Sequence, residues 1–166
     1  MKNRKYFLLP LLCCLVLCLL AACGNNDAKT SDSPAPTDTA QAADVYDTAV
    51  ADAVLNSGAF SEELEEIDLD TAALVYGVDG NALTDVKAYR SAGASAEEVA
   101  VLIFTDEAAA GDAKTAIDLY IQDREESYAD YLPSEVPKLQ SAKLDQKGNT
   151  LLLIVANDMS AAETVL

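Results

Sequence analysis

Histidine and tryptophan are absent from the chain, and no cysteine follows position 23. Without histidine, the chain lacks the commonest general base and the commonest metal ligand of proteins. All four cysteines lie at or before position 23, so residues 24–166 can form no disulfide, no thiolate nucleophile and no sulfur-bound metal site. The sequence also has no glycine-rich phosphate loop and no G-x-S-x-G motif. We therefore expect no catalytic residues, no metal site and no cofactor.

Basic residues are few compared with acidic ones. The chain has 11 Lys and Arg residues against 28 Asp and Glu residues, which gives a formal charge of −17. Residues 1–22 hold three of the basic residues and none of the acidic ones, so the remainder has eight basic and 28 acidic residues, a charge of −20. A field of this sign repels nucleic acid and anionic lipid. We expect no nucleic-acid partner, and the charge favours a basic protein or peptide.

The first 23 residues have the order of a secretory signal. A basic head with Lys2, Arg4 and Lys5 precedes an apolar run, and Leu20-Ala-Ala-Cys23 has the form of a bacterial lipobox. We expect residues 1–22 to be a lipoprotein signal peptide and the Cys23 thiol to carry a diacylglyceryl group. A retained transmembrane helix is the alternative, although the apolar run is at the short limit for a span and no basic cluster follows it. A lipid on Cys23 predicts anchoring to the cell membrane on its extracytoplasmic face.

Residues 23–42 and residues 43–166 differ in composition. The stretch after Cys23 is small, polar and proline-bearing with no apolar period, which is typical of a flexible tether. Its r.m.s. reach is roughly 25 Å. Residues 43–166 have the length and apolar content of one acidic domain.

Periodicity within 43–166 predicts an α+β fold. Helical stripes are expected over 45–56, over 71–76 with Asp70 as its N-cap, and from Asp106 to about Tyr131. A short last helix follows Asp158. Strands are expected over 85–91, 99–104, 142–144 and 151–156, with a turn at 147–149. The segment 133–138 is expected to be an extended connection, and the acidic stretch 62–70 a solvated face.

The two strands that are apolar on both faces, 99–104 and 151–156, belong in the centre of the sheet. If the long helix returns across the sheet, the four strands become antiparallel in the order 1-2-4-3. We therefore predict a four-stranded antiparallel sheet with a long helix packed on one face and short N- and C-terminal helices. The more polar strands lie at its edges.

Arg124 is the first candidate for a binding residue. It falls near the middle of the apolar stripe of the long helix, where an unpaired guanidinium is costly. One interpretation is a receptor for an anion or carboxylate, framed by Tyr128 and Tyr131. The other is an arginine that reaches past the sheet edge or pairs with a structural Asp or Glu.

The run from Tyr131 to Leu139, Tyr-Leu-Pro-Ser-Glu-Val-Pro-Lys-Leu, is the most distinctive motif. Together with the lipobox, Leu74-Val-Tyr-Gly77, the strand 98–104, Arg124 and Gly148-Asn-Thr-Leu-Leu-Leu, it resembles the domain of unknown function 4358 family of Firmicutes lipoproteins. This resemblance covers most of residues 60–160. It implies a cell-surface location and an unassigned role, and it brings no catalytic residues.

The sequence therefore predicts a non-catalytic binding or interaction domain, tethered to the outer face of the cytoplasmic membrane through Cys23. Two alternatives remain open. One is a hydrolase of envelope polymers that uses carboxylates alone, which would need a concave cleft with two carboxylates at catalytic separation. The other is a cation-responsive envelope module.

Overall fold

The computed structural model describes residues 44–166, which form an α+β fold with a five-stranded antiparallel sheet. The predicted signal peptide, the lipidation of Cys23 and the tether lie outside these residues. The helices are α1 (Ala49–Leu55), α2 (Leu69–Tyr76), α3 (Glu107–Tyr131), α4 (Val136–Gln140) and α5 (Met159–Glu163), with a 3-10 turn at Pro133–Glu135. The strands are β1 (Leu64–Ile67), β2 (Leu83–Ser91), β3 (Glu98–Phe104), β4 (Lys143–Lys147) and β5 (Thr150–Val155). Within the described part, every helix is too short or too polar to cross a membrane.

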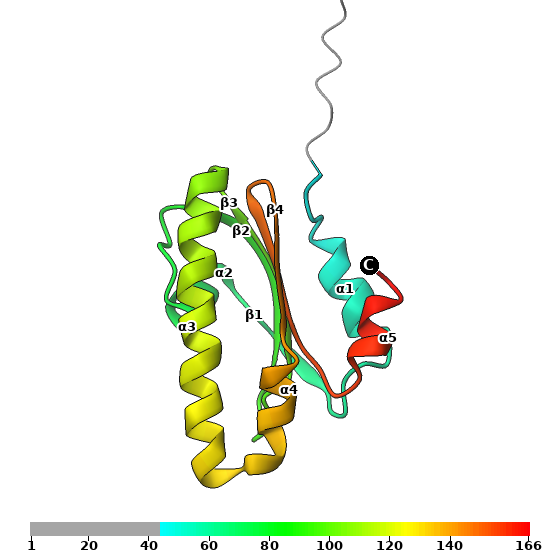
Figure 1. The fold of residues 1–166 in the computed structure, drawn as a ribbon. Helices are drawn as coiled ribbons and strands as arrows, with labels where there is room; N and C mark the ends of the chain where they lie inside the picture. The colour runs from blue at the N-terminus through cyan, green and yellow to red at the C-terminus, as the bar shows by residue number, and fades with distance from the viewer. Residues whose placement is uncertain (1–43) are drawn as a thin grey trace, which may run out of the picture. The chain divides into compact units, whose positions relative to one another are not determined.

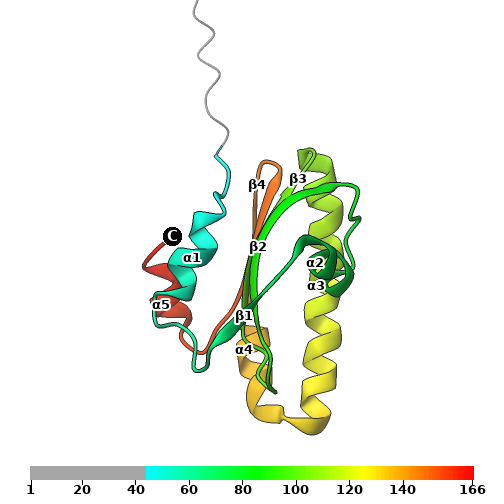
Figure 2. The ribbon, with the colours of Figure 1, turned by 180° about the vertical axis from the view of Figure 1, so that it is seen from behind.

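Helices cover both faces of the sheet, α2 and α3 on one side and α1 and α5 on the other (Figures 1 and 2). The central strands β3 and β5 alternate their side chains between two buried layers, as a strand must. Ala100, Leu102 and Phe104 join the core beneath α3, whereas Val99 and Val101 join the core beneath α1. This two-sided burial is why the two central strands are almost wholly apolar.

The observed strand order is β1-β2-β3-β5-β4, antiparallel throughout. The predicted order of the four strands at residues 85–91, 99–104, 151–156 and 142–144 is confirmed. The predicted number of four strands is wrong, because residues 64–67 add β1 beside β2. This strand was not predicted because it lies within the acidic stretch. Leu64 and Ile67 pair opposite Ser91 and Ala88, and the two glutamates between them remain exposed.

The helix boundaries depend on local capping. Asp106 caps α3 as predicted, and its side chain accepts a bond from the Ala109 amide at 2.9 Å. Helix α2 starts earlier than expected, because Asp68 rather than Asp70 accepts the amide hydrogen bond of Thr71. Helix α5 follows its predicted cap, Asp158.

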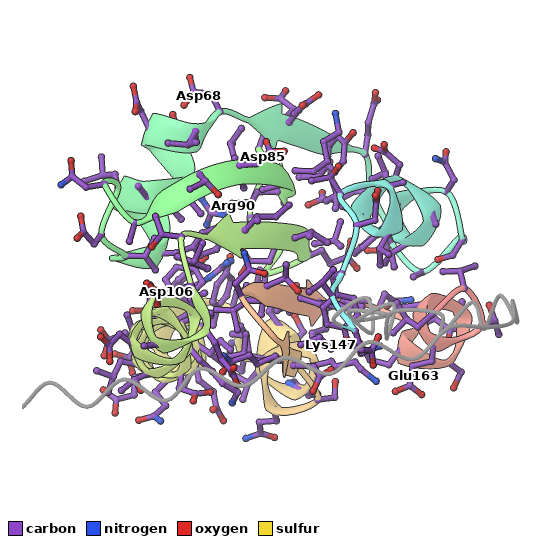
Figure 3. All side chains as sticks on the ribbon, turned by 90° about the horizontal axis from the view of Figure 1, so that it is seen from above. Asp68, Asp85, Arg90, Asp106, Lys147 and Glu163 are labelled. Carbon is purple, nitrogen blue, oxygen red and sulfur yellow. The ribbon has the colours of Figure 1, made fainter. Side chains whose placement is uncertain are left out.

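Helix α1 is shorter than predicted, because the residues before it are held against the β4–β5 hairpin. The Tyr46 amide donates to the Thr150 hydroxyl at 2.8 Å, and the Tyr46 hydroxyl contacts the Asp145 carboxylate. The Lys147 ammonium lies 3.5 Å from Asp44 and over the Tyr46 ring. The described chain thus begins at the hairpin end of the sheet, where α3 also begins (Figure 1). Figure 3 looks onto the molecule from this end, with Lys147 and Asp106 labelled.

The prediction of an extended segment over residues 133–138 is also wrong. Pro133 begins a 3-10 turn and Pro137 lies in the first turn of α4. Proline is compatible with these positions because the first amides of a helix need no intrahelical acceptor. The motif therefore folds as two short helical turns at the end of α3 (Figure 1).

Candidate functional site

Two adjacent glutamates lie where the central strand β3 begins: Glu97 directly before it and Glu98 at its first position, with exposed fractions of 1% and 0%. Glu98 shares the α3 side of the sheet with Ala100, two residues along the strand. Burial of a charged carboxylate is costly unless it is paired and hydrogen-bonded. The partners of these glutamates therefore define the chemistry at this end of the sheet.

Both carboxylate oxygens of Glu98 are bound by basic and phenolic groups. Arg124 Nη1 lies 2.7 Å from Oε1, and Arg90 Nε, on the neighbouring strand β2, lies 3.0 Å from Oε2. The hydroxyls of Tyr120 and Tyr76 lie 3.0 Å and 3.3 Å from Oε2. We call these five residues, together with Tyr128, the Glu98 cluster.

The protonation states in the Glu98 cluster follow from burial and charge. Burial lowers the pKa of Arg124, but the Glu98 charge and the neighbouring tyrosines raise it by more than burial lowers it. The net pKa of Arg124 is therefore above its ordinary value. Burial and the Glu98 charge raise the pKa of Tyr120 and that of Tyr76. The arginine therefore stays charged and both tyrosines stay protonated near neutral pH.

The structure brings Arg124 and Tyr128 together and leaves Tyr131 at the surface. Arg124 Nη2 donates to the Tyr128 hydroxyl at 3.2 Å, and the Tyr128 hydroxyl in turn donates to the Ser95 carbonyl oxygen at 2.9 Å. Tyr131 packs against the Tyr128 ring at a centroid distance of 5.0 Å and is 61% exposed. Arg124 thus has the structural carboxylate partner that one interpretation of the sequence required.

A second buried ionic group, the Glu135 cluster, joins the 3-10 turn and α4 to the loop before β3. It consists of Ser95, Glu97, Glu135 and Lys138. Lys138 Nζ lies 3.0 Å from both Glu97 and Glu135. Glu135 also accepts from the Ala96 amide at 2.9 Å and the Ser95 hydroxyl at 3.0 Å. The motif at 131–139 thus supplies the Glu135 carboxylate as the acceptor for the Ala96 amide, which lies in the loop before β3.

The two clusters together contain three carboxylates and three basic groups. Within residues 44–166, every buried side-chain nitrogen and oxygen has a hydrogen-bond partner. A general acid or nucleophile needs an atom that is free to meet a substrate, and both Glu98 oxygens are already engaged. The arrangement is therefore suited to holding β3, α3 and α4 in register.

Sequence reasoning found Arg124 and Tyr128 but missed Arg90, Glu98 and the Glu135 cluster. The signal was present, because two glutamates directly precede the apolar run 99–104, and charged side chains in that position need basic partners. Ser95-x-x-Glu98 resembles a helix capping box, and Glu98 is instead the first residue of β3.

The basic residues of the domain are all used internally. All seven in residues 44–166 lie within 3.7 Å of a carboxylate oxygen: Lys87, Arg90, Lys114, Arg124, Lys138, Lys143 and Lys147. These contacts engage seven of the 25 carboxylates in that range, which leaves 18 without a basic partner. In the same residues, no three acidic side chains are grouped so as to hold a metal ion.

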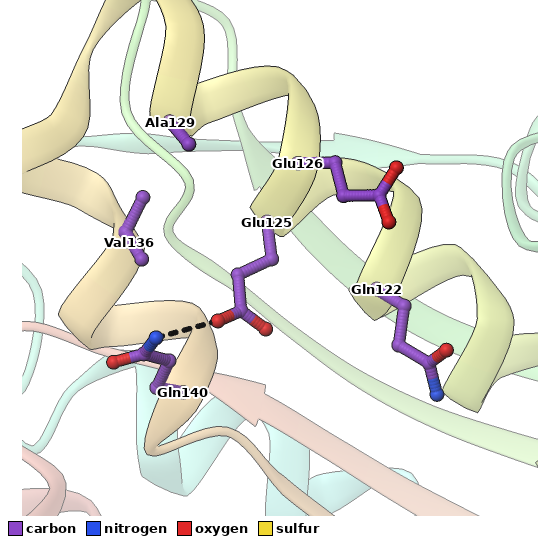
Figure 4. A pocket seen from close by; sticks show the side chains of 6 residues that line it. All are labelled: Gln122, Glu125, Glu126, Ala129, Val136 and Gln140. Carbon is purple, nitrogen blue, oxygen red and sulfur yellow. Dashed lines mark hydrogen bonds between the residues drawn. The ribbon is translucent and has the colours of Figure 1, made fainter.

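Several hollows are lined by α3, and two of them lie between α3 and another helix. One, of about 410 Å³, lies between α3 and α4, and Gln140 donates to Glu125 across it at 2.6 Å (Figure 4). The other, of about 310 Å³, lies between α2 and α3. Its lining includes Leu74 and Leu119, which are 83% and 57% exposed, and Tyr120 of the Glu98 cluster. The first groove is bridged by a hydrogen bond, whereas the second presents apolar side chains to solvent.

Comparison with curated proteins and with solved structures finds no match. A family model described as Domain of unknown function (DUF4358) matches residues 56–156, which include both clusters and the sheet from β1 to β5. Because this match covers more than half of the chain, the protein belongs to the DUF4358 family.

Proposed function

We propose that this protein is a non-catalytic binding domain that a lipid on Cys23 holds at the outer face of the cell membrane, and that its partner is a basic protein or peptide. The observation that carries the proposal is the pairing of all seven basic residues in residues 44–166. An anionic ligand would therefore meet a carboxylate beside every basic group, whereas a cationic ligand meets carboxylates without basic partners.

The state of the buried carboxylates supports a non-catalytic role. Glu97, Glu98 and Glu135 are each bound by a basic side chain, and they hold structural elements together. A hydrolase that uses two carboxylates requires one of them to donate a proton to the leaving group and therefore to face a cleft. The buried carboxylates face the protein's own arginines and lysine instead.

Salt-dependent binding tests the proposal. The full chain, anchored in vesicles of zwitterionic lipid, is titrated with a fluorescent lysine–serine peptide and, as the matched control, with a glutamate–serine peptide of equal length. We expect the lysine peptide to bind with an affinity that falls as salt is raised, and the glutamate peptide not to bind. Equal binding of the two peptides, or no dependence on salt, would overturn the proposal. Cleavage of purified envelope polymer by the same preparation would overturn its non-catalytic part.

A further inference from the structure

One exposed stripe of α3 changes from apolar to acidic along the helix. Ala116, Leu119, Asp123, Glu126 and Asp130 are spaced three or four residues apart, so they share a helix face. The stripe spans about 21 Å at the α-helical rise. Its apolar end lines a hollow together with α2, and α2 covers the same face of the sheet as α3 (Figure 2).

The apolar end of this stripe forms the wall of the α2/α3 groove. Leu119 faces the groove from α3 and Leu74 from α2, and Tyr76 and Tyr120 also line it. Two large apolar side chains that are more than half exposed and share one hollow indicate a contact surface rather than scattered surface residues.

The acidic end continues directly from the groove. Asp123 lines both the α2/α3 groove and the neighbouring hollow, which Glu126 and Asp130 line further along α3. None of these three carboxylates belongs to a salt bridge in residues 44–166. Asp130 lies in the last turn of α3, which has no basic residue, and the helix dipole disfavours a carboxylate there. Helix stability therefore does not account for this charge.

We propose that the α2/α3 groove docks an amphipathic basic helix of a partner protein. This inference rests on the proposed function and specifies its surface. The partner places apolar side chains between Leu74 and Leu119, and lysines or arginines beside Asp123, Glu126 and Asp130. Spacings of four and three residues along α3 are those of a helix seam, so a second helix can follow it through both parts. Charge complementarity selects a basic helix over a neutral or acidic one.

Two matched peptides test the surface. One is a helical peptide that has leucines on one turn and lysines on the following turns, with these residues spaced alternately three and four apart. The other peptide has serine in place of each leucine. Both are titrated against the full chain in zwitterionic vesicles. We expect Leu74→Ser/Leu119→Ser to weaken binding of the leucine–lysine peptide by about tenfold or more and to leave the serine–lysine peptide unaffected. Leu166→Gln, an exposed apolar residue outside the groove, is the control and should change neither.

The charged half of the stripe has its own control. Glu126→Gln/Asp130→Asn should weaken both lysine peptides by about threefold to tenfold. Glu63→Gln/Glu65→Gln removes the same charge from exposed residues at β1 and should have a smaller effect. Because the four glutamates and aspartates and both leucines are exposed, unchanged urea midpoints will show that each variant is folded.

The outcomes separate the two proposals. If the leucine variant binds the leucine–lysine peptide as the unaltered protein does, the docking surface is wrong while the basic-partner proposal stands. If the unaltered protein binds neither lysine peptide, the proposed function fails and the docking surface with it.

Discussion

Substitution of Glu98 by glutamine should destabilise this domain more than any exposed charge change. Glu98 is fully buried, and its oxygens contact Arg124 at 2.7 Å and Arg90 at 3.0 Å. At an effective dielectric constant near 20, each contact has a gross attraction of about 5–6 kcal/mol. Desolvation of the three charges offsets much of that attraction in the folded protein. Glutamine removes this attraction and leaves the two arginines facing each other without a negative charge between them. It also replaces one carboxylate oxygen, an acceptor, by an NH2 group, a donor, at a position surrounded by other donors.

Removal of one member of a buried ion pair typically costs about 3–5 kcal/mol, and we expect Glu98→Gln to fall in this range. A domain of this length has a total free energy of unfolding of roughly 6–18 kcal/mol. Over most of that range the expected loss is smaller than the total, so the variant should still fold. Its melting temperature should fall by about 10–20 °C. Urea unfolding, followed by far-ultraviolet circular dichroism, measures the free-energy change from the shift in midpoint at constant slope.

Two companion variants make the test specific. Asp118→Asn breaks the exposed Lys114–Asp118 pair, whose atoms are 3.7 Å apart, and should change stability by less than about 0.5 kcal/mol. Joint replacement of Arg90, Glu98 and Arg124 by methionine removes all three charges at once and should recover most of the loss. A cost of Glu98→Gln below about 1 kcal/mol, comparable with that of Asp118→Asn, would refute the view that the Glu98 cluster is a stability element.

Three further predictions concern the titrating groups and the proposed lipid anchor. Burial raises the pKa of Glu135, but hydrogen bonds from the Ala96 amide, Lys138 and Ser95 lower it, and the net pKa is below the ordinary value of 4.5. The contribution of Glu135 to stability should therefore be complete above pH 4.5 and be lost as the pH falls further. Glu135→Gln should make the urea midpoint depend less steeply on pH in the acid range. Burial and Glu98 raise the pKa of Tyr76 and Tyr120, so the folded chain keeps protons that the unfolded chain loses above about pH 10. Stability should therefore fall with rising alkaline pH, and tyrosinate absorbance should show both groups ionising only as the protein unfolds. Mass spectrometry of the protein extracted from membranes should show a chain that begins at Cys23 with a diacylglyceryl group on its sulfur, and Cys23→Ala should abolish both the lipid and the cut; an unaltered protein that keeps residues 1–22 and has no lipid on Cys23 would contradict the lipid anchor.

The sheet could be predicted largely from the sequence because its centre obeys one strong rule. Strands β3 and β5 are apolar on both faces, which places them side by side between helical layers. Strand β1 could not be found in this way, because its two apolar residues enclose exposed glutamates and its pairing depends on the far end of β2. Edge strands of this length carry little local signal, and tertiary pairing determines them.

The candidate site was predictable only in part for a similar reason. Arg124 stands out because a single helix places it among apolar residues. Its partner Glu98 lies 26 positions earlier on another element, and no local pattern joins them. The prolines of the 131–139 motif were misleading, because proline fits both an extended segment and the first turn of a helix.

The Glu98 cluster and the α2/α3 groove meet at Tyr120. Its hydroxyl contacts Glu98 and Arg124 inside the core, and Tyr120 is one of the residues that line the groove. Leu119 is the next residue of α3, so the contacts that fix Tyr120 also fix the rotation at which α3 presents Leu119 to solvent. A purely apolar core of similar volume could be equally stable, but it would lack the directional bonds that hold one rotation of the helix. In a domain without disulfides in residues 44–166, this directionality is a physical reason for a buried ionic group to lie beneath an exposed apolar surface.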